Sequence, residues 1–205
     1  MKLEIVTLTV HVTRLMMSFI LYATFMNGAM ADAMKDNLVI DDRSSNDMTS
    51  NLGTKWQLVT DNVMGGLSSG QLTMDTYKGK KCLRMRGDVT TENNGGFLQI
   101  ALSLSEQGAF DASGYTGVEI EVAGNNQSYN IHFRTDGLWF PWQSYRVSFT
   151  AESDWQTYRI PFSELEKYKT FHSFSQDEIK RIGLVAIGRE FQADLCLAAI
   201  GFYHD

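Results

Sequence analysis

Two glutamates on one predicted strand come nearest to a catalytic arrangement in this chain. Glu119 and Glu121 occupy alternate positions of the stretch GVEIEV, so their side chains share one face about 7 Å apart. Two carboxylates at such a spacing are typical of glycosidases. Alternating glutamates are also common on exposed strands, and this second interpretation is favoured. Because the sequence has no G-x-S-x-G motif, no Ser-His-Asp order and no metal-ligand spacing, we expect a protein that is not an enzyme and needs no metal or cofactor.

A glycine-rich stretch, VTDNVMGGLSSG at residues 59–70, is a candidate for phosphate binding. Gly65 and Gly70 fit the glycines of the phosphate-binding motif G-x-x-x-x-G-K-[ST]. Gln71 and Leu72 stand where that motif needs its lysine and its hydroxyl. The residues that follow have the pattern of a strand, whereas a phosphate loop leads into a helix. The sequence therefore argues against nucleotide binding at this loop.

The same stretch fits a shaped turn better. Asp61 and Asn62 can bond their own backbone in Asx turns, and Gly65 and Gly66 can adopt positive φ. Ser68 is placed to bond a free amide. We predict a structural turn that also borders a ligand site through Asp61 and Asn62.

Aromatic residues gather in the loop TDGLWFPWQ, residues 135–143. Trp139 and Trp142 lie there between two predicted strands, where aromatic rings can stack on a sugar or grip a partner chain. The alternative is that the loop folds over the end of the core. Burial is the usual state of large aromatic side chains, which favours this alternative. Even so, we expect at least one of the two tryptophans to be partly exposed.

Three basic or hydrogen-bonding residues flank this loop. His132, Arg134 and Arg146 fall on the polar phase of two neighbouring predicted strands. If these strands pair as a hairpin, the three side chains form one patch that can bind a carboxylate or sugar hydroxyls. The alternative, which is favoured, is a solvated strand face with Glu119 and Glu121 as partners.

The elements that position these residues are mostly strands. Beyond Trp56 the hydrophobic pattern has a period of two, with turn residues between the runs. About nine strands are expected, together with one or two short helices at 163–169 and 175–181, where Ser175-x-x-Glu178 resembles a capping box. Several of the predicted strands have one polar, solvent-exposed face, which indicates antiparallel sheets. The pattern predicts an all-β jelly-roll β-sandwich over residues 56–205, preceded by a polar linker at 32–55 with a possible first short strand at 38–40.

Composition limits the classes of partner. The chain has 205 residues and a formal net charge of -6, and it has no basic cluster that would suit a phosphate backbone. We therefore expect no nucleic-acid binding.

The first 31 residues have the features of an export signal. Lys2 and Arg14 precede the apolar run at 15–26, and Ala29-Met30-Ala31 fits a cleavage site. As a helix the run would span about 18 Å, less than the hydrocarbon core of about 30 Å. We expect an exported, periplasmic protein with no stable membrane span. The alternative is an anchor formed by an uncleaved N-terminus.

Export would permit a disulfide between Cys82 and Cys196, each of which lies in a predicted strand. The alternative is a pair of buried thiols. The spacing does not choose between them, and the thiol alternative is slightly favoured.

Several of these stretches together resemble the signature of the complex I intermediate-associated protein 30 family. The resemblance covers roughly residues 38–203 and rests on Trp56 followed by VTDNVMGGLSSG, then on Gly95-Gly96-Phe97, Gly117-Val118-Glu119-Ile120, Trp155 with Ile160-Pro161-Phe162, and Ile182-Gly183-Leu184.

This resemblance implies a galactose-binding-like β-sandwich, related to carbohydrate-binding modules, without catalytic residues. It implies a protein-binding or chaperone-like role such as that of a respiratory complex I assembly factor. The alternative is a carbohydrate-binding module of the bacterial envelope, and a glycan-acting enzyme is the third hypothesis. The expected partner is accordingly a protein or a glycan.

Overall fold

Twelve β-strands make up most of residues 37–205, the part of the chain that the computed structural model describes. The sequence pattern predicts all of them except β2 and β10, which have only four and three residues. The predicted export signal lies outside the described residues. In chain order the strands are β1 (Leu38–Asp41), β2 (Gln57–Thr60), β3 (Ser69–Tyr77), β4 (Lys80–Val89), β5 (Phe97–Ser103), β6 (Gly117–Gly124), β7 (Gln127–Thr135), β8 (Ser144–Ala151), β9 (Gln156–Pro161), β10 (Glu166–Tyr168), β11 (Ile179–Ile187) and β12 (Phe191–Tyr203).

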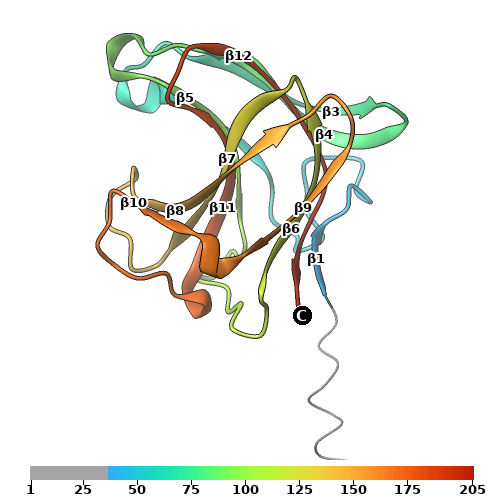
Figure 1. Ribbon diagram of the computed structural model, residues 1–205, viewed down its shortest axis with the longest axis vertical. Helices are drawn as coiled ribbons and strands as arrows, with labels where there is room; N and C mark the ends of the chain where they lie inside the picture. Colours follow the sequence, from blue (N-terminus) through green and yellow to red (C-terminus); the bar gives the residue numbers. More distant parts are fainter. Residues whose placement is uncertain (1–36) are drawn as a thin grey trace, which may run out of the picture. The chain divides into compact units, whose positions relative to one another are not determined.

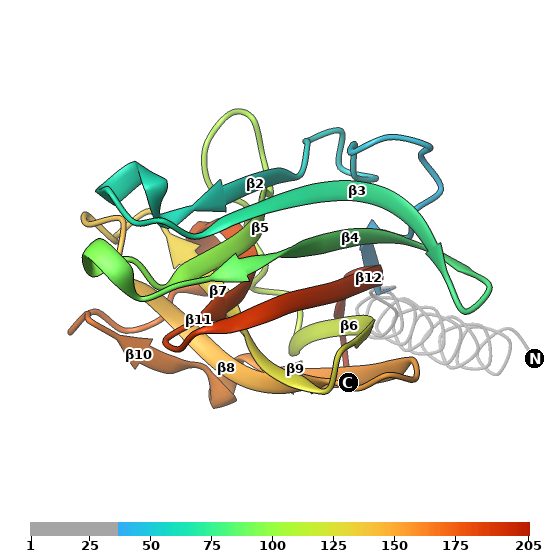
Figure 2. The same ribbon diagram turned by 90° about the horizontal axis from the view of Figure 1, so that it is seen from above.

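The strands form two antiparallel sheets that pack face to face (Figures 1 and 2). One, here called the β12 sheet, has the order β3-β4-β12-β6-β9, with β1 paired to the end of β12 beyond β4. The other, the β11 sheet, has the order β10-β8-β7-β11-β5-β2. The predicted all-β, jelly-roll type of sandwich is confirmed. Among residues 37–205, no helix has the length and apolar character needed to cross a membrane.

The core between the sheets follows the two-residue alternation of the strands. On β7, Tyr129, Ile131 and Phe133 point inward and are fully buried, whereas Asn130 and His132 point outward. The same alternation continues on β8 and β5. Each strand of the β11 sheet therefore gives one set of side chains to the core and another to the outer face.

The predicted helices are not formed as such. The first region contains a 3-10 turn, η3 (Phe162–Glu164), followed by β10, and the second contains η4 (Gln176–Glu178), which leads directly into β11. Ser175 makes no side-chain cap hydrogen bond. Backbone pairing with β8 draws residues 166–168 into the sheet, and the core needs the apolar residues that follow η4. Tertiary packing thus overrides the local helix signal.

The described part of the predicted linker, residues 37–55, packs into the same compact unit as the sandwich. Asp41 and Arg43 are both buried and form an ion pair, in which Arg43 Nε donates to Asp41 Oδ1 over 2.8 Å. Trp56 Nε1 donates to the other carboxylate oxygen over 2.6 Å. Because a buried charge is stable only when it is paired, these three residues fix the N-terminal segment to the core.

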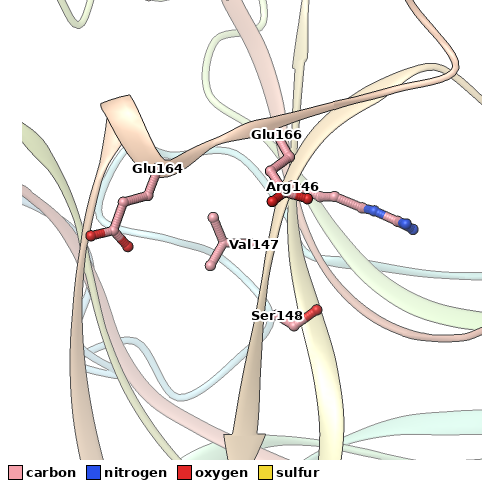
Figure 3. A pocket seen from close by; sticks show the side chains of 5 residues that line it. All are labelled: Arg146, Val147, Ser148, Glu164 and Glu166. Carbon is pink, nitrogen blue, oxygen red and sulfur yellow. The ribbon is translucent and has the colours of Figure 1, made fainter.

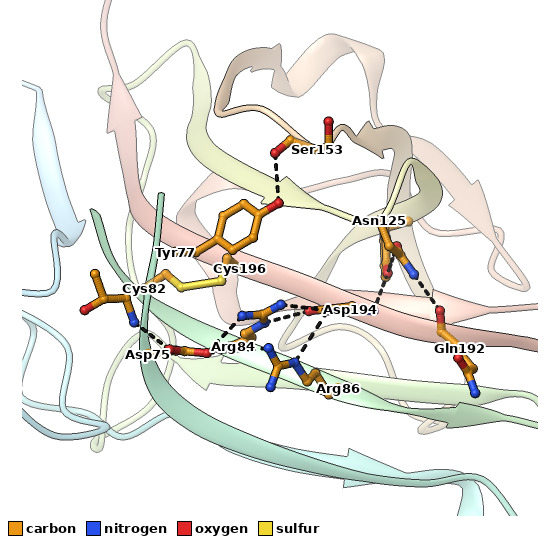
Figure 4. Close-up of polar contacts among 12 residues, drawn as sticks. Asp75, Tyr77, Cys82, Arg84, Arg86, Asn125, Ser153, Gln192, Asp194 and Cys196 are labelled. Carbon is orange, nitrogen blue, oxygen red and sulfur yellow. Dashed lines mark hydrogen bonds and ion pairs between the residues drawn. A yellow bond between two sulfur atoms is a disulfide. The ribbon is translucent and has the colours of Figure 1, made fainter. Parts of the chain in front are cut away.

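Cys82 on β4 and Cys196 on the neighbouring β12 form a disulfide (Figure 4). Their Cα atoms are 5.4 Å apart, a separation that suits a disulfide. The preference for two free thiols is therefore wrong. The sequence could not place β4 beside β12, and the bond depends on that neighbourhood.

The disulfide closes a long chain segment, with 114 residues of sequence separation. We expect the double variant Cys82→Ala/Cys196→Ala to lose about 2–4 kcal/mol of the free energy of unfolding, because the crosslink restricts the unfolded chain. Urea denaturation measures the change. Dithiothreitol should destabilise the wild type and leave the double variant unaffected. Equal stability of the two proteins would contradict the assignment.

Candidate functional site

The glycine-rich stretch forms a turn around the buried carboxylate of Asp61. This carboxylate accepts hydrogen bonds from Ser68 N over 2.9 Å, from Ser68 Oγ, from Gly96 N over 2.6 Å and from Phe97 N over 3.2 Å. Burial by itself would raise the pKa of Asp61, but these hydrogen bonds outweigh it and hold the pKa below its usual value. Asp61 has no exposed surface, so the prediction that it borders a ligand site is wrong.

The glycines of the turn have separate tasks. Gly65 has a φ of 88°, and its backbone N–H closes η1 (Asp61–Met64). Gly66 and Gly95 lie so close to Asp61 that an added Cβ atom would be 2.4 Å and 2.6 Å from its side chain. Asn62 is exposed, and its side chain donates to Ser68 O over 3.2 Å. The stretch thus serves backbone geometry.

The two glutamates of the catalytic hypothesis are occupied in ion pairs. Glu119 lies 3.5 Å from Arg159, and Glu121 pairs with Lys80. Both glutamates belong to β6 in the β12 sheet. Since cations of the chain hold them on an outer sheet face, they do not form a convergent acid and base.

The loop at 136–143 presents its aromatic rings to solvent. Trp139 is 85% exposed, Phe140 51% and Trp142 48%, whereas Leu138 is buried. The rings of Phe140 and Trp142 stack with centres 4.8 Å apart and planes 7° apart. The expected exposure of at least one tryptophan is confirmed, and the packed alternative is wrong. We call Trp139, Phe140 and Trp142 the aromatic platform.

Two polar side chains hold the backbone of this loop. The guanidinium of Arg134 contacts the carbonyls of Phe140, Pro141 and Gln143 over 2.8, 2.9 and 2.6 Å. The side-chain oxygen of Gln143 accepts from the N–H groups of Trp139 and Phe140 over 3.1 and 3.0 Å. Arg134 is therefore a residue that positions the loop, and the platform is fixed before any ligand arrives.

A second loop, which is bonded to the platform loop, carries another exposed ring. Gln143 Nε2 donates to Lys169 O over 3.2 Å, which ties the two loops together. Phe171, two residues further on, is 100% exposed.

The three residues of the predicted patch lie on the paired strands β7 and β8, at the outer face of the β11 sheet. Arg146 lies opposite His132, and His132 lies opposite Gly183 of β11. The guanidinium of Arg146 lies 3.8 Å from the ring centre of Tyr168 on β10. Arg134 is opposite Arg181. The hairpin therefore brings together the three residues that the sequence singled out, and the sheet adds Tyr168 and Arg181.

Two polar atoms on this face are buried without a hydrogen-bond partner among the described residues. They are His132 Nε2 and Ser144 Oγ. Burial, and next the charge of Arg146, lowers the pKa of His132 to about 3, so the imidazole is neutral at neutral pH. Unsatisfied buried polar atoms are costly and commonly mark a place where another group bonds.

A shallow pocket of about 440 Å³ opens at the edge of this face (Figure 3). Arg146, Val147 and Ser148 of β8 line it, together with Glu164 and Glu166, of which Glu166 is the register partner of Arg146 on β10. The side chain of Arg146 extends away from both carboxylates in this view. No group of His, Cys, Asp and Glu residues in 37–205 has an arrangement that would hold a metal ion.

Sequence reasoning missed Tyr168, Gln143, Phe171 and Arg181. Tyr168 and Phe171 lie in the region predicted as helix and in the loop after it, and Gln143 is an ordinary polar residue until its loop is folded. Arg181 is the last residue of the region predicted as the second helix, whereas the structure places it on β11. Its register against Arg134 could not be read from the sequence.

Comparison with known proteins identifies a family and several similar solved structures. The family model "Complex I intermediate-associated protein 30" matches residues 45–197. The comparison with curated proteins gave no match. Among solved structures, a family 11 carbohydrate-binding module of the cellulosomal cellulase Lic26A-Cel5E of Clostridium thermocellum has a TM-score of 0.65 at 14% identity, covering 83% of this chain and 95% of that one.

Two further structures are similar. One is the family 11 module of Clostridium thermocellum in complex with a β-1,3-1,4-mixed-linked tetrasaccharide, with a TM-score of 0.64, 14% identity and coverage of 82% and 95%. The other is the family 30 carbohydrate-binding module of the cellulosomal cellulase Cel9D-Cel44B of the same organism, with a TM-score of 0.60, 18% identity and coverage of 83% and 98%. At these identities the likeness concerns the fold.

The role of Asp61 can be tested through stability. We expect Asp61→Asn to lower the free energy of unfolding at neutral pH by about 2–4 kcal/mol, because charge-assisted hydrogen bonds to a buried group are lost. The folded-state pKa is lowered, so this stabilisation is present above the unfolded pKa of about 3.9 and is lost as the pH falls through the folded value.

Urea denaturation of the wild type and of Asp61→Asn between neutral pH and about pH 3 measures the effect. The difference between their free energies of unfolding should become smaller as the pH falls. Asn62→Ala is the control, since it removes one partly buried, uncharged hydrogen bond at the neighbouring position. A difference in free energy of unfolding that stays constant with pH would refute the proposed role of the carboxylate.

The positioning role of Arg134 predicts a change in loop dynamics. Lysine in its place cannot reach three carbonyls with a planar fork. We expect Arg134→Lys to speed hydrogen exchange of the Trp139 and Phe140 amides roughly tenfold by weakening the loop that protects them. Arg159→Lys, on the other sheet, should leave these amides unchanged. Equal protection in Arg134→Lys would show that Gln143 alone holds the loop.

Proposed function

This chain belongs to the complex I intermediate-associated protein 30 family, and from that premise we propose that it is a non-catalytic module that binds a glycan. One observation carries the proposal: the aromatic platform is held open by Arg134 and Gln143 next to the polar outer face of the β11 sheet. A sugar presents flat apolar ring faces and a rim of hydroxyls. A site for it needs exposed aromatic rings beside hydrogen-bonding side chains.

The polar part of the proposed site lies on neighbouring strands. Asn130 and Ser148 face each other on β7 and β8, where Ser148 Oγ and Asn130 Oδ1 are 3.0 Å apart. Gln99 of β5 reaches over Gly183, since its Oε1 is 3.0 Å from the position of an added Cβ. Amides and hydroxyls both donate and accept, which suits sugar hydroxyls. Because Gly183 has no side chain, the centre of the outer face of the β11 sheet does not protrude.

The fold supports the same proposal. The carbohydrate-binding modules that resemble this chain are all-β domains of similar length. The predicted export signal would bring the protein to envelope or extracellular glycans. Glu119 and Glu121 are engaged in ion pairs, which agrees with binding in the absence of catalysis.

A protein partner is the second candidate, as for an assembly factor. The observation that favours it is the extent of exposed apolar surface, because Phe171, on the loop that Gln143 ties to the platform loop, is a further fully exposed ring. Protein interfaces are enriched in such aromatic anchors. A protein ligand should depend on Phe171, whereas a sugar bound to the platform and the polar face should not.

Binding to purified polysaccharides tests the proposal. We expect Trp139→Ala and Trp142→Ala each to weaken glycan binding about tenfold, which corresponds to about 1.4 kcal/mol. Affinity electrophoresis and isothermal titration of the full chain measure it.

Val63→Ala is the matched control, since it trims an exposed apolar side chain from a different loop. Phe171→Ala should keep glycan binding. If no polysaccharide binds the wild type, while an envelope protein binds it and is lost with Phe171→Ala, the second candidate replaces the first.

A further inference from the structure

The arginines of the two sheets differ in how their charges are balanced. In the β12 sheet, Arg84 contacts Asp75 and Asp194 over 3.0 and 2.7 Å, and Arg86 lies 3.7 and 3.5 Å from the same two carboxylates (Figure 4). Arg159 pairs with Glu119 and with the C-terminal residue. The arginines of that outer face are thus neutralised by neighbouring acids.

The outer face of the β11 sheet is different. Within residues 37–205, neither Arg134, Arg146 nor Arg181 takes part in an ion pair with any carboxylate. The chain has 24 acidic and 18 basic residues, so acids are not scarce. Arg134 and Arg181 are directly opposite each other on β7 and β11, and like charges in that position destabilise a sheet.

These three arginines are not equally available. Arg134 is engaged with loop carbonyls, and burial, followed by the charge of Arg181, lowers its pKa. Arg181 is exposed, and no side-chain hydrogen bond joins it to another of residues 37–205. The guanidinium of Arg146 lies over the ring of Tyr168. Although Glu166 is its register partner on β10, no ion pair forms between them. Arg181 and Arg146 therefore offer guanidinium groups to a ligand.

We propose that the ligand is an anionic glycan, with carboxylate or sulfate groups on its sugar rings. The inference rests on the proposed glycan-binding function and specifies the ligand class. Rings stack on the aromatic platform, while Arg181 and Arg146 receive the anionic groups on the adjacent sheet face. A guanidinium binds a carboxylate or sulfate through two parallel hydrogen bonds, which gives orientation as well as attraction. A bound anion also relieves the repulsion between Arg134 and Arg181.

A comparison of three polysaccharides tests this. The probes are polygalacturonate, which is carboxylated, carrageenan, which is sulfated, and a mixed-linkage β-glucan, which is neutral. We expect the full chain to bind at least one anionic probe more tightly than the neutral one. Raising NaCl from about 50 mM to about 500 mM should weaken that binding, because salt screens exposed charges. The probe that binds better identifies the anionic group.

Charge variants make the test specific to this face. Arg181→Gln and Arg146→Gln should each weaken binding of the anionic probe at least tenfold, and Arg181→Lys should fall between Arg181→Gln and the wild type. Arg159→Gln is the matched control, since it removes the same charge from an exposed strand of the other sheet. Thermal denaturation establishes that all four variants fold.

The outcomes separate the two proposals. If the neutral glucan binds as tightly as the anionic probes and Arg181→Gln has no effect, the anionic inference is overturned and the glycan-binding function stands. If Arg159→Gln weakens binding as much as Arg181→Gln, only general charge attraction is at work, and the inference also falls. If no polysaccharide binds, both proposals fall together.

Discussion

The architecture depends on one buried carboxylate, that of Asp61. It accepts hydrogen bonds from Ser68, just before β3 of the β12 sheet, and from Gly96 and Phe97, at the start of β5 of the β11 sheet. The chain passes from one sheet to the other at this turn. A carboxylate without solvent is stable only when its oxygens are bonded, so the turn, the second loop and both sheets must all be in place around it.

The glycines of the sequence signature follow from this constraint. Gly66 and Gly95 contact the carboxylate too closely for a side chain, and Gly65 has a positive φ. A stretch that looks like a phosphate loop therefore binds an anion after all, but the anion belongs to the chain itself. The backbone N–H of Ser68 in this stretch and those of Gly96 and Phe97 in the second loop bond the carboxylate of Asp61.

Sequence reasoning was most successful where the signal was periodic. The alternation of polar and apolar residues predicted ten of the twelve strands and put His132 and Arg146 on one face, because a two-residue period fixes which side of a sheet each residue faces. It failed for segments whose conformation depends on a neighbour. β10 exists because β8 pairs with it, and the disulfide exists because β4 lies beside β12. Strand order is a long-range property that local patterns do not encode.

The aromatic platform is a functional feature that local sequence patterns could predict only in part. The sequence drew attention to Trp139 and Trp142, but large aromatics are usually buried, and nothing local indicated that Arg134 would bond three carbonyls of their loop. That arrangement has a physical consequence. A loop already fixed in its binding conformation loses little entropy when a ligand arrives.

The basic residues near this loop also have different roles. Arg134 is held inside the loop and shapes the platform, and it places its positive charge opposite Arg181. Within residues 37–205 no carboxylate forms an ion pair with either arginine, so a negative charge on a ligand would relieve their repulsion. The preorganised aromatic rings thus adjoin arginines whose charges are not paired. A neutral ligand would contact the rings and leave the arginine charges without a counter-charge, whereas an anionic glycan contacts the rings and pairs with the arginines.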